Sequence, residues 1–159
     1  MLMREGPARH SRRSRRSQPP RERLPSRRMT RFGIDAPTLL HLVAEDVPIA
    51  PAHQLVAPQA LRSQALALLF DAVRRGELPE TEALRRHEVL TGIKVRLLGD
   101  RVSRRVAWQL AREHGLEIAD AEHLAVTRLQ ADAFVSVDPA ARARAEGIVP
   151  LASVDQLAG

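Results

Sequence analysis

The stretch that best indicates the fold runs from residue 114 to residue 139 and reads HGLEIADAEHLAVTRLQADAFVSVDP. It joins a helix-like run to a short apolar run that ends in Asp138 and Pro139. A second stretch, RFGIDAPTLLHLV at residues 31–43, has a similar strand-to-helix boundary, with an apolar run ending in Asp35 before helical spacing begins. Both stretches are typical of a buried strand that leads into a helix.

The alternation continues through the chain from Met29 onward. Helical spacing, or start and stop signals, occur at residues 36–46, 59–76, 79–92, 101–115, 120–130 and 139–147. Strand-like runs occur at residues 31–35, 54–57, 131–138 and 148–153, and residues 93–100 fit either a strand or an extended connection. Strands that alternate with helices predict an α/β fold, here a small α/β/α sandwich around a central, mainly parallel sheet.

Composition excludes several classes of site. The 159-residue chain has no cysteine, so disulfides, thiolate catalysis and zinc ribbons are excluded. Its six histidines show no ligand spacing, so no histidine metal site is expected. No apolar run approaches the roughly 18 residues that a membrane span needs. We therefore expect a cytoplasmic protein with no membrane partner.

The net charge of +6 belongs to one end of the chain. Residues 1–30 hold ten arginines and two glutamates, or +8, which leaves 6 − 8 = −2 for the rest. Residues 1–29 have too few apolar residues to fold, so we expect a disordered extension, with the folded domain at residues 30–159. The extension is open to three interpretations: a phosphate-binding arm, a targeting peptide that lacks an apolar core, or a wrongly assigned start ahead of Met29.

Three aspartates are placed to meet at one edge of the predicted sheet. Asp35 and Asp138 end strand-like runs, and Asp120 opens the helix between them. Ligands of open α/β sheets bind at the carboxyl ends of the strands, and gathered carboxylates suit a divalent cation. The alternative is helix capping, since aspartate is a preferred N-cap and Pro139 follows Asp138 at a first helical position.

Taken in order, these residues resemble the PIN-domain family, and most closely VapC-like toxins of prokaryotic toxin–antitoxin pairs. The resemblance covers Arg31 to Leu157. It rests on the apolar run ending at Asp35, the helix after Pro58, DAEHLA after HGL, and AFVSVD followed by AEGIVPL.

The resemblance implies a ribonuclease that binds Mg²⁺ or Mn²⁺ through four acids, forms a homodimer and is inhibited by a small antitoxin protein. Asp35, Asp120 and Asp138 match three of the acids. The family usually has a glutamate six residues after the proline, where this chain has Gln64. A metal-bound water would attack the RNA phosphate, and Gln64 would position that water or the metal.

Gln64 leaves two interpretations open. Three carboxylates bind metal more weakly than four, so the domain is either an active nuclease or a weak or inactive binding module for RNA or an antitoxin-like protein. No nearby acid replaces the lost charge, because Asp71 lies about 10 Å further along the same helix and Glu122 points away from Asp120. If Gln64 is a degraded ligand, Gln64→Glu should raise activity.

Other side chains carry weaker signals. Val102, Val106 and Leu110 recur at helical spacing and predict the buried stripe of their helix. Trp108 is assigned to core or interface packing rather than to base stacking. Four arginines either follow the RNA backbone or form a solvated surface: Arg62, Arg101, Arg104 and Arg105. Besides the active nuclease and the weak or inactive binding module, a third function is possible for the whole protein. In it, the arginine-rich extension makes the protein a nucleic-acid-binding accessory factor.

Overall fold

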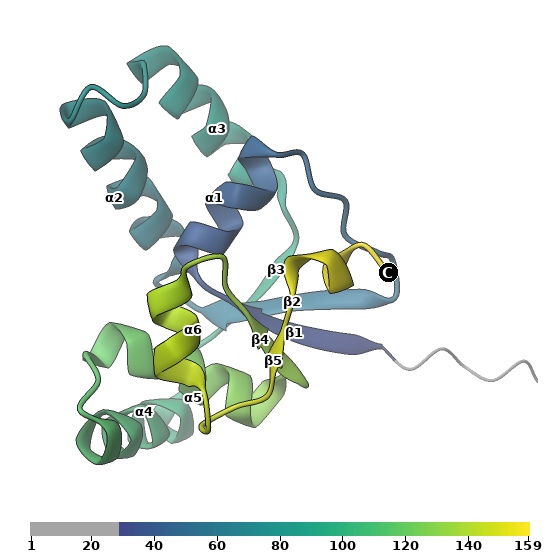
Figure 1. The fold of residues 1–159 in the computed structure, drawn as a ribbon, viewed down its shortest axis with the longest axis vertical. Helices are drawn as coiled ribbons and strands as arrows, with labels where there is room; N and C mark the ends of the chain where they lie inside the picture. Colours follow the sequence, from purple (N-terminus) through teal and green to yellow (C-terminus); the bar gives the residue numbers. More distant parts are fainter. Residues whose placement is uncertain (1–28) are drawn as a thin grey trace, which may run out of the picture.

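The computed structural model describes residues 29–159, so the arginine-rich extension expected at residues 1–29 lies outside the described part apart from Met29. Figure 1 shows the arrangement of the elements. They are β1 (Thr30–Ile34), α1 (Ala36–Ala44), β2 (His53–Pro58), α2 (Leu61–Arg74), α3 (Glu80–Gly92), β3 (Val95–Leu98), α4 (Arg101–His114), α5 (Ile118–Gln130), β4 (Ala133–Val135), α6 (Pro139–Ala145), β5 (Leu151–Ala152) and a final 3₁₀ turn, η1 (Val154–Leu157).

Within residues 29–159, five parallel strands form a single sheet in the order β3-β2-β1-β4-β5. The α/β fold and the parallel sheet are therefore confirmed, and residues 93–100 contain a strand, β3. The chain builds outward from β1 to β3 on one side, then crosses back to place β4 on the other side of β1. The strand order thus reverses between β1 and β4, where open α/β sheets bind ligands.

Helices cover both faces of the sheet. The first core joins α1, α2 and α3 to one face through buried residues such as Ile34, Leu39 and Leu55. The second joins α4, α5 and α6 to the other face through Leu110, Leu124 and other side chains. Figure 1 shows the two groups of helices on opposite sides of the strands. The three-layer arrangement holds the carboxyl edge of the sheet between α1 and α5.

A glycine in β1 sets how closely α5 approaches the sheet. A Cβ atom added to Gly33 would lie 2.0 Å from Oγ1 of Thr127, so no larger residue fits at this place. One turn back along α5, Nδ1 of His123 lies 3.1 Å from the carbonyl oxygen of Ile34. The helix therefore runs back along β1 and carries its first turn, with Asp120, past the carboxyl end of that strand.

Helix α4 confirms part of the predicted stripe, since Leu110 is buried and Val106 packs against the second core, and corrects the rest. Its buried residues are Ser103, Ala107 and Leu110, whereas Val102 is 58% exposed. Trp108 is 66% exposed, so it does not pack in the core, and its assignment to an interface stays a prediction. Small side chains on the inner face of α4 let it pack closely on α5, and apolar periodicity alone does not detect a stripe built from serine and alanine.

The first turn of α5 also differs from expectation. The helix begins at Ile118 with Glu117 at the N-cap, so Asp120 lies inside the first turn and does not open the helix. Within the described residues, no helix is both long and apolar enough to cross a membrane.

Candidate functional site

The four residues predicted for the site line one pocket of about 320 Å³ at the carboxyl edge of the sheet, and we call it the acid pocket. They come from four different parts of the chain. Asp35 lies between β1 and α1, Gln64 lies on α2, Asp120 lies on α5 and Asp138 precedes α6. The expected convergence at the strand ends is therefore observed, although up to 103 residues separate its members.

Asp35 is the buried carboxylate of the acid pocket, with 7% of its surface exposed. Its Oδ1 accepts hydrogen bonds from the backbone nitrogen of Thr38, at 3.1 Å, and from the Thr38 hydroxyl. Its Oδ2 accepts from the hydroxyl of Ser136 at 2.6 Å. Neutral donors on both oxygens hold the carboxylate in one orientation, and Oδ2, which accepts one hydrogen bond, keeps a second lone pair.

Asp138 and Asp120 are more open. Oδ1 of Asp138 accepts from the backbone nitrogen of Ala140 at 3.0 Å, and so caps α6. Helix capping thus uses one carboxylate oxygen of Asp138 and one of Asp35. It uses neither oxygen of Asp120, because the N-cap of α5 is Glu117, which makes no side-chain hydrogen bond there. The carboxylates of Asp120 and Asp138 keep 41% and 39% of their side-chain surface exposed.

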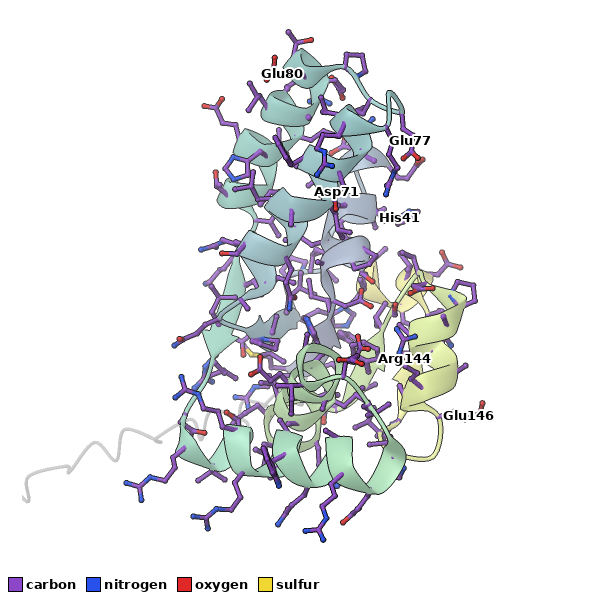
Figure 2. All side chains as sticks on the ribbon, turned by 90° about the vertical axis from the view of Figure 1, so that its left-hand side faces the viewer. His41, Asp71, Glu77, Glu80, Arg144 and Glu146 are labelled. Carbon is purple, nitrogen blue, oxygen red and sulfur yellow. The ribbon has the colours of Figure 1, made fainter. Side chains whose placement is uncertain are left out.

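Arg144 is a member of the acid pocket that sequence reasoning missed. Its Nε lies 3.4 Å from Oδ2 of Asp120, and its Nη2 lies 3.9 Å from Oδ2 of Asp138. Figure 2 shows its side chain extending from α6 toward the middle of the molecule. The run PAARARA offers two arginines, and the sequence does not show that Arg142 instead donates to the carbonyl oxygen of Ala152.

His123 is the second member that was missed. It is 7% exposed, and its Nε2 lies 2.8 Å from the side-chain amide of Gln64. Burial lowers the pKa of His123, against the opposing effect of the Asp35 charge. The available signal was its position three residues after Asp120, which places both side chains on one helix face. A search for paired histidines does not detect a single histidine of this kind.

The hydrogen bonds of His123 explain what Gln64 does in this structure. The carbonyl oxygen of Ile34 only accepts, so Nδ1 of His123 must carry a proton and donate to it. In the structure Nε2 faces Oε1 of Gln64, which only accepts, so this contact as it stands has Nε2 donating from a charged ring. When the ring is neutral, the Gln64 amide must turn over so that its NH₂ group donates to Nε2. An amide serves both forms because it has a donor and an acceptor. A carboxylate at position 64 would serve only the charged ring.

The donors of the acid pocket fit a hard divalent cation in type, since they are carboxylate and amide oxygens. Their arrangement differs from that of a preformed metal site. Across residues 29–159, no three aspartate, glutamate or histidine side chains stand close enough together to hold a metal ion. Arg144 bridges two of the carboxylates, and hydrogen bonds from the protein occupy part of the third. The donor set therefore suits a cation in type, and a cation bound here would need Arg144 to move away and the carboxylates to come closer together.

The two acids considered as replacements for a glutamate lie elsewhere. Asp71 is 3.7 Å from Arg74 on an exposed part of α2, and Figure 2 shows it well removed from Arg144. Glu122 lines a different cavity, together with Arg104. Neither side chain lines the acid pocket.

The fold and this pocket together define a small, all-parallel α/β protein with an acidic site at the switch point of its sheet. No family model and no curated protein matches the chain. Among solved structures it is similar to PAE2754 from Pyrobaculum aerophilum, with 22% identity and a TM-score of 0.64 over 82% of this chain and 93% of that chain. At this level of identity the similarity shows the fold alone.

Proposed function

We propose that this protein is an endoribonuclease that depends on Mg²⁺ or Mn²⁺ and hydrolyses RNA phosphodiester bonds in the acid pocket. The observation that carries the proposal is the convergence of Asp35, Gln64, Asp120 and Asp138 on one pocket at the carboxyl edge of a parallel sheet. RNA is proposed as the substrate because the same residues occur in the order that resembles PIN domains.

The chain's own residues have distinct tasks in this proposal. Asp35, Asp120 and Asp138 would hold the cation, which when bound supplies a water of lowered pKa and offsets charge on the phosphate. The hydroxyls of Thr38 and Ser136 keep Asp35 oriented. Gln64, held by His123, would orient the attacking water with its amide.

The biological role follows from the resemblance. We propose that the protein is the toxin of a toxin–antitoxin pair, that it acts as a homodimer, and that a small antitoxin protein covers the acid pocket. A short reading frame directly upstream, whose product copurifies with this chain and blocks cleavage, is the expected finding. An upstream product that neither binds nor inhibits would contradict this role.

A second candidate function is a PIN-like binding module with little or no activity, which takes RNA or an antitoxin-like protein. Two observations favour it. Gln64 is hydrogen-bonded to His123. Arg144 lies between Asp120 and Asp138, where a cation would bind. This candidate predicts RNA binding without cleavage at any Mn²⁺ concentration.

Cleavage assays with matched aspartate variants separate the two. We expect the wild-type protein to cleave single-stranded RNA with Mn²⁺, and Asp120→Asn to reduce the rate at least about 100-fold, because it removes one of three ligand charges. Asp35→Asn should act likewise. Asp71→Asn removes the same charge from the exposed part of α2 and should leave the rate unchanged. Cleavage that continues in EDTA, or that Asp120→Asn leaves intact, would refute the metal-dependent mechanism.

A further inference from the structure

Arg144 is the one arginine that lines the acid pocket, and among residues 29–159 no lysine lines it either. It comes from the last turn of α6. Its guanidinium reaches Oδ2 of Asp120 through Nε and Oδ2 of Asp138 through Nη2, at 3.4 and 3.9 Å. One side chain therefore joins acids from two separate elements, α5 and the start of α6.

The three acids of the pocket differ in the charge of their partners. Asp35 receives its hydrogen bonds from neutral groups, the hydroxyls of Thr38 and Ser136 and a backbone N–H. Carboxylates brought to one pocket repel each other, and a nearby cation favours their charged form. An arginine cannot lose its proton in a protein, so the guanidinium offers a permanent positive charge to Asp120 and Asp138.

A divalent cation would need the same oxygens. Mg²⁺ binds carboxylate oxygens at about 2.0–2.1 Å, and a guanidinium at its present distance from both Oδ2 atoms would repel it. The existing ion pairs are weak enough to break, because Arg144 is 39% exposed and neither contact has the short, two-pronged geometry of a strong pair. Occupation by arginine and occupation by metal therefore exclude each other.

We propose that Arg144 is a displaceable counterion of the acid pocket, which holds Asp120 and Asp138 in the metal-free protein and leaves both when a divalent cation binds. The inference rests on the proposed function only in requiring that a cation bind these two acids. The apparent metal affinity is then set by competition, and it is lower than the carboxylates alone would give.

The test is a calorimetric titration of MnCl₂ into the full chain, compared for the wild type, Arg144→Ala and Arg144→Gln. Removing two partly exposed ion pairs should tighten Mn²⁺ binding on the order of fivefold in both variants. Arg112→Ala removes the same charge from an exposed position on α4 and should bind Mn²⁺ as the wild type does. In an Asp120→Asn background the gain from Arg144→Ala should shrink, because one of its two ion pairs is already absent.

The outcomes separate this inference from the proposed function. Mn²⁺ binding that is equal or weaker in the Arg144 variants overturns the competition and leaves the metal site standing. Binding by the Arg144 variants alone supports the competition in its strongest form. If neither the wild type nor the folded Arg144 variants bind Mn²⁺, both the metal site and the role of Arg144 are overturned. Circular dichroism confirms that each variant is folded, and the two substitutions give independent readings.

Discussion

Replacing Gln64 with glutamate tests whether this position is a lost metal ligand or a partner of His123. On the first interpretation, Gln64→Glu restores a fourth carboxylate, and metal binding and activity rise at every pH. The structure gives a different expectation. Nε2 of His123 lies 2.8 Å from the Gln64 amide, while Nδ1 donates to the carbonyl oxygen of Ile34. A carboxylate in place of the amide would meet Nε2 and require it to be protonated.

The expected size of this effect follows from the contact. Two unit charges about 4 Å apart interact by about 4 kcal/mol at an effective dielectric constant of 20, before desolvation is subtracted. The net effect of such pairs on a pKa is about 1–3 units. Burial lowers the pKa of His123 in the wild type, and the new carboxylate should raise it again by about that amount. Below the raised pKa, the charge of Glu at position 64 is offset by His123 and is of little use to a cation.

Two measurements check this expectation. A ¹⁵N-edited titration should give a higher His123 pKa in Gln64→Glu than in the wild type. The gain in Mn²⁺ affinity should be small below the raised pKa and should grow as the pH rises through it. Gln109→Glu adds the same charge on the exposed face of α4 and should change neither quantity. An unchanged His123 pKa, or a gain in Mn²⁺ affinity that is as large below the raised pKa as above it, would refute the reasoning.

Much of the fold is predictable from local signals, because they agree with the tertiary structure. The run ending in Asp35 is followed by Pro37 in the first turn of α1, and Asp138 is followed by Pro139 in the same way. The local sequence pattern is less informative where tertiary packing determines which side chains are buried. The inner face of α4 uses Ser103 and Ala107, whose burial depends on the distance to α5 and not on their own hydropathy.

The acid pocket was predictable in its acids but not in its polar partners. Parallel strands share a carboxyl edge, so Asp35 and Asp138 were expected at the same edge of the sheet, and the pairing of β1 with β4 brings them close together. The placement of Arg144 depends on which side of a seven-residue helix faces α5, and PAARARA is arginine-rich on more than one side. The place of His123 could be predicted only by knowing that α5 runs closely along β1. Gly33 permits this close packing because it has no side chain. Contacts between distant segments leave no periodic signal in the sequence.

Two further predictions follow from α5 and its neighbours. Gly33→Ala should lower the free energy of unfolding by about 1–3 kcal/mol in urea titrations, since the new Cβ would overlap Oγ1 of Thr127, and Thr127→Ala should restore part of the loss. A Gly33→Ala protein of wild-type stability would show that α5 is free to shift. Burial holds the pKa of His123 below its usual value near 6.5, so the unfolded chain binds this proton more readily than the folded one. Stability should therefore fall as the pH drops through about 6.5, and the thermal unfolding temperature should depend less on pH between 7.5 and 5.5 in His123→Gln. An equal slope in both proteins would mean that His123 titrates alike in the folded and unfolded chains, and hence that its burial does not favour the neutral ring.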